Sequence, residues 1–216
     1  MINVAPDVAA HVRPGWLILD GVSVAEGTPA MDGPLVEATS RMRAAADQPE
    51  RTALVRAMYR RFGVDPTKTR PSSEALLRRV RKGDPLPRIN TVVDICNWCS
   101  LEFQVPYGLY DLARVRGPIE LRVGRPGESF AGIRKDDVHL DGRLVLADDA
   151  GAFGNPTSDS ARTMVTTAAV SILAVIFAPA AVSSAALQQM LETTSARMRE
   201  FAGGVERARG IADNQR

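Results

Sequence analysis

The sequence predicts an α+β fold, with a mixed, largely antiparallel sheet surrounded by helices. Helical periodicity dominates residues 34–103, apolar runs punctuated by glycine follow over 117–151, and an amphipathic helix comes last, at 183–202. Helices followed by strands favour α+β over a doubly wound sheet, in which the two alternate. A chain of 216 residues with 45% hydrophobic content is long enough to bury a core.

The elements before residue 104 follow from periodicity and from helix boundaries. Pro34 and Pro49 each stand at a position that a first helical turn tolerates, and Gly63 and Gly83 are natural helix stops. The segment 88–103 has apolar residues at helical rather than alternate spacing, which predicts a mostly buried helix. The predicted elements are a strand over 15–24 and helices over 34–47, 49–63, 72–83 and 88–103.

The second half predicts strands first and then a covering helix. Residues 163–191 carry no charge, but their unbroken apolar stretch is far shorter than the roughly 20 residues that a membrane-spanning helix needs. We therefore expect a buried strand, a turn at Pro179 and a helix. The full set is strands within 117–133, 137–142 and 143–151, a helix over 183–202, one domain over 1–205 and a polar tail over 206–216.

Composition sets few limits on partners. The formal net charge of +2 and the isoelectric point near 8.7 are too mild to require a polyanionic partner. Residues 1–15 contain no basic segment followed by an apolar run, so we expect no signal peptide and a cytoplasmic location.

The charge is concentrated in the predicted helices between residues 51 and 88. Eleven Arg and Lys residues face three acidic ones there, a local excess of eight positive charges. Such grouping favours a surface that binds phosphate backbones, although a solvated helical face explains an isolated charged helix as well. The candidate RNA-binding residues are Arg70, Arg78, Arg79, Arg81, Lys82 and Arg88.

The two cysteines, Cys96 and Cys99, have the spacing of redox and metal motifs. A catalytic pair opens a helix, where free N–H groups lower the thiol pKa, whereas Cys96 falls in the middle of a predicted helix. A structural zinc site needs more ligands, and His11 and His139 are single and distant. We expect no metal, no cofactor and two small buried thiols, unless one of them lines a pocket.

Residues 90–111 read NTVVDICNWCSLEFQVPYGLYD. This segment resembles the signature of the tRNA-editing domain (B3/B4 type) in the β chain of phenylalanyl-tRNA synthetase, N-x-V-V-D-I-T-N-x-x-x-L-E-x-x-x-P-x-H-A-F-D. The resemblance continues through the next strands to an A-G-x-x-G loop at Ala150 and covers about residues 70–179. It implies a freestanding protein built on this module. Matches without a gap are Asn90, Val92, Val93, Asp94, Ile95, Asn97, Leu101, Glu102, Pro106 and Asp111.

The resemblance implies a pocket that accepts the 3′ end of a mischarged tRNA and hydrolyses its aminoacyl ester. The family's pocket threonine, proline, histidine, two loop glycines and later glutamate fall at Cys96, Pro106, Gly108, Gly151, Gly154 and near Ala174. Three polar groups are therefore replaced. We expect a different or roomier pocket that does not copy tyrosine editing.

The segment 155–163 concentrates polar side chains before a buried strand, which makes it a candidate for the chemistry. Asp159 is the candidate for ordering a water or an ammonium group, and Arg162 for binding a phosphate or carboxylate. Cys96 is the weaker candidate, as a covalent nucleophile without a histidine to activate it. Asn155 and Ser158 are further candidate substrate contacts, although Asn-Pro and Ser-Asp also suit a capped turn.

Hydrolysis of an activated ester needs mainly a positioned water and donors for the oxyanion. We expect the backbone N–H groups around Gly151 and Gly154 to provide the donors. Three functions stay open: an aminoacyl-tRNA deacylase acting in trans, a module that binds tRNA or an amino-acid-like ligand without hydrolysis, and an enzyme of small-molecule or aminoacyl-transfer chemistry. Loss of turnover with retained RNA affinity in Asp159→Ala would separate the first from the second. A steep salt dependence would exclude the third.

Overall fold

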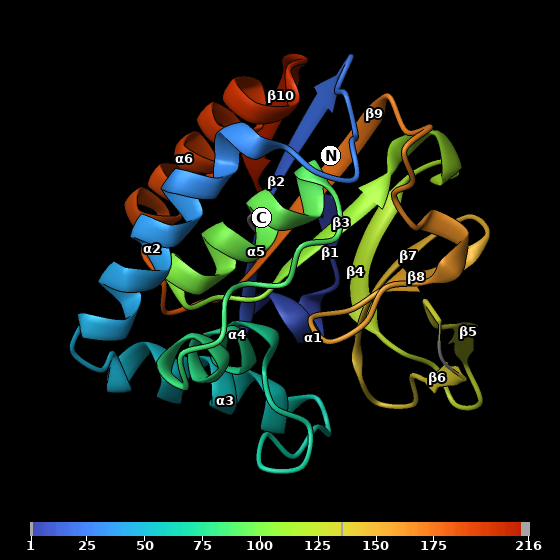
Figure 1. Cartoon of the computed structure of the whole chain (residues 1–216). Coiled ribbons are helices and arrows are strands. Elements are labelled where there is room, and N and C mark those ends of the chain that lie inside the picture. Colours follow the sequence, from blue (N-terminus) through green and yellow to red (C-terminus); the bar gives the residue numbers. More distant parts are fainter. Residues whose placement is uncertain (1, 135, 213–216) are drawn as a thin grey trace.

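The computed structural model describes residues 2–134 and 136–212, and it confirms the α+β class (Figure 1). The strands of this part of the chain are β1 (Ile2–Val4), β2 (Val12–Asp20), β3 (Tyr107–Asp111), β4 (Ile119–Val123), β5 (Ser129–Ala131), β6 (Asp137–His139), β7 (Leu144–Asp148), β8 (Gly151–Gly154), β9 (Ser171–Pro179) and β10 (Val205–Ile211). Its α-helices are α1 (Pro6–Ala9), α2 (Asp32–Ala44), α3 (Pro49–Arg61), α4 (Ser72–Arg81), α5 (Thr91–Phe103) and α6 (Ser184–Ala202).

Eight of these strands form two four-stranded sheets. The β9 sheet has the order β10-β2-β9-β3 and is antiparallel throughout. The β4 sheet has the order β1-β4-β7-β8, in which β1 runs parallel to β4 and the other pairs are antiparallel. Strands β5 and β6 pair separately. The predicted mixed, largely antiparallel pairing is thus confirmed, distributed over two sheets.

The β9 strand explains the long uncharged segment of the sequence. It pairs with β2 on one side and β3 on the other, and residues 172–179 are all buried. The chain leaves β9 at Pro179, as predicted, and α6 begins after Ser183, whose hydroxyl accepts a hydrogen bond from the Ala186 N–H at 3.2 Å. Helices α5 and α6 cover the β9 sheet (Figure 1). At Gly15 a Cβ atom would meet the Leu187 side chain at 3.0 Å, so glycine permits this close approach.

The start of helix α5 is fixed by residues at the beginning of the motif that covers residues 90–111. The Asn90 side chain caps it by accepting a hydrogen bond from the Val93 N–H at 3.0 Å. The buried Asp94 carboxylate accepts hydrogen bonds at 2.8 Å from the Ile89 N–H and from Nε of Arg88. The helix ends where Gln104 takes a left-handed conformation, with φ of 55°. Cys96 therefore lies in the middle of α5, as predicted.

The structure corrects the predicted polar tail at 206–216. Val205–Ile211 form β10, an edge strand of the β9 sheet that pairs with β2. Charged and small residues alternate from Arg207 to Gly210, and the register with β2 shifts between Glu206 and Ala208. Residues 213–216 of the predicted tail lie outside the described residues. Strands β1, β3 and β8, which the sequence pattern did not predict, have three to five residues each.

The uncharged, apolar segment around β9 forms a strand and not a helix. Among the helices of the described chain, none is both long enough and apolar enough to cross a membrane.

Candidate functional site

The main candidate site is a cavity of about 520 Å³ between α4, α5, β3 and the segment 159–167. This volume lies within the usual range for ligand sites. Glu26 and Arg134 are exposed residues of the lining, whereas Asp159 is half-buried, with one carboxylate oxygen out of contact with solvent. The lining residues are Glu26, Ser72, Leu76, Ile89, Asn90, Val93, Cys96, Asn97, Ser100, Tyr107, Gly108, Leu109, Ile133, Arg134, Asp159, Met164, Val165, Thr166 and Thr167.

Three of the predicted site residues meet in this cavity. Cys96 comes from α5, Gly108 from β3 and Asp159 from the polar segment after β8. Asn97 also lines it. The sequence analysis did not select Asn97 as a site residue, although its match to the motif is a signal that could have found it. Thr166, Thr167 and Arg134 were missed, because single polar residues in irregular segments carry no pattern that distinguishes a lining position from a surface one.

The turn before Asp159 is held rigidly. Oδ1 of Asn155 accepts hydrogen bonds from the N–H groups of Thr157 and Ser158, each at 2.8 Å, and the Asn155 N–H donates to the Ser158 carbonyl at 2.9 Å. These bonds explain the positions of Asn155 and Ser158 through turn formation, the alternative to a substrate contact. A bridge between Gly154 and Asp159 closes the turn.

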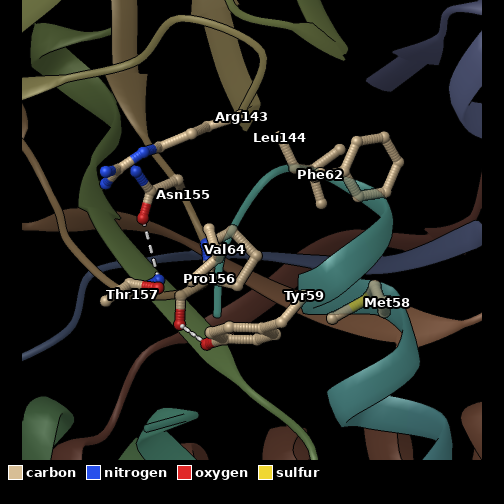
Figure 2. Close-up of a pocket in the computed structure, with 9 residues that line it drawn as sticks. All are labelled: Met58, Tyr59, Phe62, Val64, Arg143, Leu144, Asn155, Pro156 and Thr157. Carbon is tan, nitrogen blue, oxygen red and sulfur yellow. Dashed lines mark hydrogen bonds between the residues drawn. The ribbon is translucent and has the colours of Figure 1, made fainter. Parts of the chain in front are cut away.

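The outer side of this turn is fastened to α3 and α4. The Pro156 carbonyl accepts hydrogen bonds from the Tyr59 hydroxyl at 2.9 Å and from the Ser72 hydroxyl at 3.4 Å. Figure 2 shows the Tyr59 bond beside a second, small cavity of about 20 Å³, lined by residues that include Asn155 and Arg143. A volume of this size admits about one water molecule, so this second cavity is too small for an aminoacyl group.

The charge of Asp159 acts on two buried neighbours. Burial raises the pKa of the Cys96 thiol well above its ordinary value, and the nearby groups Cys99 and Asp159 raise it further. Burial likewise raises the pKa of the Tyr110 phenol, with Asp159 as the next cause. Cys96 therefore stays a neutral thiol near pH 7, which argues against its predicted role as a nucleophile.

Cys99 belongs to a separate contact between α5 and α6. Its sulfur accepts a hydrogen bond from Nη1 of Arg197 at 3.4 Å, and the Arg197 guanidinium stacks 3.8 Å from the centre of the Trp98 ring. Arg197 also pairs with Glu102, which pairs in turn with Arg41 of α2. Burial raises the pKa of the Cys99 thiol. Among the described residues, no three His, Cys, Asp or Glu side chains are placed to hold a metal ion.

Arg162, a predicted substrate contact, is directed away from the cavity. Its guanidinium donates to both oxygens of Asp148, at 2.8 and 2.9 Å, and to the carbonyls of Arg114 and Gly151. The Asp148 side chain is fully buried and also accepts from the N–H groups of Arg116 and Ala150. Burial raises the pKa of Asp148, but these hydrogen bonds outweigh it and leave the pKa below its ordinary value. The pair therefore anchors the end of β7 to the segment after β8.

The two loop glycines are also separate from the lining. Gly151 has φ of 108° and its carbonyl accepts from Arg162, whereas Gly154 is buried beside Tyr110. The buried Pro106 contributes its carbonyl to a hydrogen bond with the Phe177 N–H at 3.0 Å. Ala174, where the family's glutamate falls, is buried in β9 opposite Leu109. The expected backbone donors for an oxyanion are therefore not at this cavity.

The basic helices divide into paired and unpaired side chains. Four of the six candidates contact other groups of the protein: Arg70 binds Glu74, Arg79 binds the Pro85 carbonyl, Arg81 binds Asp47, and Arg88 binds Asp94 and Asp32. Arg78 and Lys82 are exposed, and within the described residues no hydrogen bond or ion pair holds their side chains. They lie on α4 and at its C-terminal end, and α4 contributes Ser72 and Leu76 to the cavity.

The α+β frame, the motif on α5 and β3 and the cavity between them are the features of an editing-type domain. The chain belongs to the B3/4 domain family, whose model matches residues 54–209. This match confirms the resemblance inferred from residues 90–111.

Relatives of this chain include β subunits of phenylalanine–tRNA ligase. The subunit from Thiobacillus denitrificans is 32% identical over 151 residues, 67% of this chain and 18% of the subunit. The subunit from Streptomyces avermitilis is 31% identical over 161 residues, 71% of this chain and 19% of the subunit. The chain thus spans less than a fifth of the length of either subunit. An N-terminal fragment of the phenylalanyl-tRNA synthetase β subunit from Pyrococcus horikoshii aligns with 94% of this chain and 49% of that one, with a TM-score of 0.49 and 14% identity.

Proposed function

We propose that this protein is an aminoacyl-tRNA deacylase that acts in trans and hydrolyses the ester between a wrongly attached amino acid and the terminal ribose of a tRNA. One observation carries the proposal: Cys96, Gly108 and Asp159, from three separate segments, line a single cavity of about 520 Å³. Membership of the B3/4 family supports the aminoacyl-tRNA class of substrate.

In the proposed reaction, a water attacks the ester carbonyl while the cavity holds the aminoacyl group. The half-buried Asp159 carboxylate orders this water or binds the substrate's ammonium group. The Asn97 amide and the Thr166 hydroxyl line the same cavity and are donors for the oxyanion that develops on the carbonyl. The neutral Cys96 thiol contributes shape and weak polarity to the wall rather than a covalent bond.

The proposed RNA contacts follow from the position of α4. One side of this helix contributes Ser72 and Leu76 to the cavity, while Arg78 and Lys82 are exposed. Arg134 adds a positive charge from the lining itself. A tRNA acceptor end bound on this surface would bring its phosphates to the basic residues while its terminal ribose enters the cavity.

The test is release of labelled amino acid from a panel of correctly and wrongly charged tRNAs, with the 216-residue chain and with Asp159→Ala. We expect release from a few species, and a loss of at least about 100-fold in Asp159→Ala. Asp141→Ala is the matched control, because Asp141 is exposed in the connection between β6 and β7. Its rate should equal that of the unchanged protein.

The other outcomes assign the alternative functions. Absence of release from every tRNA, with RNA binding retained, would overturn the deacylase and identify a binding module. If the protein neither releases amino acid from tRNA nor binds RNA, but binds a free amino acid, the cavity is a small-molecule site and the basic helices are a solvated face. If Asp159→Ala and Asp141→Ala lose deacylation activity equally, Asp159 has no special role in the reaction.

A further inference from the structure

Tyr110 of β3 occupies space that two glycines leave open. Its side chain is fully buried and packs edge-on against Phe153, with ring centres 4.9 Å apart. Its Cζ atom lies 2.8 Å from the place that a Cβ at Gly108 would take and 2.6 Å from the corresponding place at Gly154, and the hydroxyl oxygen is nearer to both. Neither glycine can carry a side chain while the phenol keeps this position.

The phenol hydroxyl lies directly behind one part of the cavity wall. Gly108, which the hydroxyl overlies, is a lining residue, and so are Cys96 and Asp159. Both of these side chains are close enough to Tyr110 that their charges would raise the pKa of the phenol. Because glycine has no side chain, the phenol rather than a side chain at residue 108 fills the space behind this part of the wall.

We propose that Tyr110 determines the size of the aminoacyl side chain that the site accepts. This inference rests on the proposed deacylase function. Because the buried phenol fills the space behind Gly108, the site should prefer alanyl, seryl and threonyl esters and disfavour phenylalanyl and tyrosyl esters. A residue without the outer ring atoms would open this end to larger side chains.

The first arm of the test measures packing and needs no activity. Gly108→Ala places a methyl group against the phenol, so this variant should unfold at a lower temperature than the unchanged protein. In the Tyr110→Leu background, which lacks the overlapping ring atoms, the same substitution should cost much less stability. If the two substitutions lower the unfolding temperature by additive amounts, the phenol does not fill this space and the proposal is overturned.

The second arm measures selectivity on alanyl-, seryl-, threonyl-, phenylalanyl- and tyrosyl-tRNA. Tyr110→Leu should shift the ratio of kcat/KM values at least about tenfold toward the aromatic esters, a change typical of altered pocket size. Tyr110→Phe is the matched control: it keeps the ring and removes one oxygen, so its ratio should stay near that of the unchanged protein. Circular dichroism of each variant checks that it is folded.

The outcomes separate the selectivity proposal from the proposed function. Hydrolysis with an unchanged size preference in folded Tyr110→Leu would overturn the role of Tyr110 and leave the deacylase intact. Absence of hydrolysis in the unchanged protein, together with no binding of non-hydrolysable 3′-amide analogues of aminoacyl-adenosine, would overturn the deacylase and this proposal with it. Binding of the analogues without hydrolysis would overturn the deacylase alone, and the same size series would then be measured as Kd values.

Discussion

Asp159 and Arg162 lie three residues apart in one polar segment, yet the fold uses them in opposite ways. Asp159 faces the large cavity, whereas Arg162 turns inward and binds the buried Asp148. Sequence position alone does not distinguish them, since both follow the same turn. A polar segment beside a site thus contains residues that hold the site in place as well as residues that line it.

The basic helices repeat this contrast. Arg88 and Arg81 are used in ion pairs within the protein, whereas Arg78 and Lys82 are exposed on α4 and at its end. The net charge of the segment does not distinguish the arginines in ion pairs from the exposed Arg78 and Lys82. For each position, loss of the side chain should therefore change mainly stability or mainly activity.

The largest effect should come from the anchored end of the polar segment. Arg162→Ala leaves the fully buried Asp148 carboxylate without its guanidinium partner, and breaking such a pair costs roughly 3–5 kcal/mol of unfolding free energy. Urea denaturation followed by circular dichroism measures the loss. Deacylation per folded molecule should fall much less than stability. A variant as stable as the unchanged protein but inactive would reverse the assignment of Arg162.

At Asp159, which lines the cavity, a substitution should reduce activity more than stability. Asp159→Asn keeps the shape of the side chain and removes its charge, so we expect kcat/KM for the best tRNA to fall about 100-fold, equivalent to roughly 2.7 kcal/mol of transition-state free energy. The urea midpoint should move less than it does in Arg162→Ala. A loss of stability as large as that of Arg162→Ala would show that Asp159 is itself an anchor.

The Asp148 pair should also appear in the pH dependence of stability. Its pKa is lowered in the folded state, so its contribution is complete above the unfolded carboxyl pKa of about 4 and is lost as pH falls through the folded value. Unfolding free energies measured from pH 7 to pH 2 should fall less steeply in Asp148→Asn than in the unchanged protein. If the unfolding free energies of the two proteins fall in parallel with pH, Asp148 does not contribute to the loss of stability in acid.

The sequence predicted those parts of the site that depend on local pattern or on the motif. Cys96 lies in mid-helix as predicted, because helical periodicity is a property of a short segment. The cap at Asn90 was not predicted, and the helix begins at Thr91 rather than at residue 88. Gly108 and Asp159 were placed near one pocket through the resemblance and the polar segment. The cysteine pair was correctly placed inside a helix rather than at its start.

The rest depends on pairings between distant segments, which local patterns do not encode. Strand β10 forms only because its edge meets β2, almost the whole chain away, and Arg162 turns inward only because β7 brings Asp148 beneath it. The phenol of Tyr110 fills the space at Gly154 for the same reason, since β3 and β8 belong to different sheets. Tertiary contact decided each of these positions.

A smaller effect should follow from loosening the turn before Asp159. Tyr59→Phe removes the hydrogen bond to the Pro156 carbonyl, while the longer bond from Ser72 remains. We expect a loss of about 1 kcal/mol of stability and a few-fold lower kcat with unchanged KM. Burial raises the pKa of Tyr59 to about 12, so the effect should not vary between pH 6 and pH 9. A change in KM alone would show that the turn contributes to binding and not to the position of Asp159.

The smallest effect should come from the exposed basic residues of α4. The double variant Arg78→Gln with Lys82→Gln should bind tRNA a few-fold more weakly, and the slope of log K against log salt should fall by about one per lost phosphate contact. Arg88→Gln is the control: it removes one positive charge and leaves the buried Asp94 without its guanidinium partner, so it should reduce stability and leave the salt slope nearly unchanged. Filter binding of tRNA at several salt concentrations measures the slopes. Equal slopes for the double variant and the unchanged protein would place the RNA elsewhere on the molecule, because exposed cations that touch phosphates must release counterions.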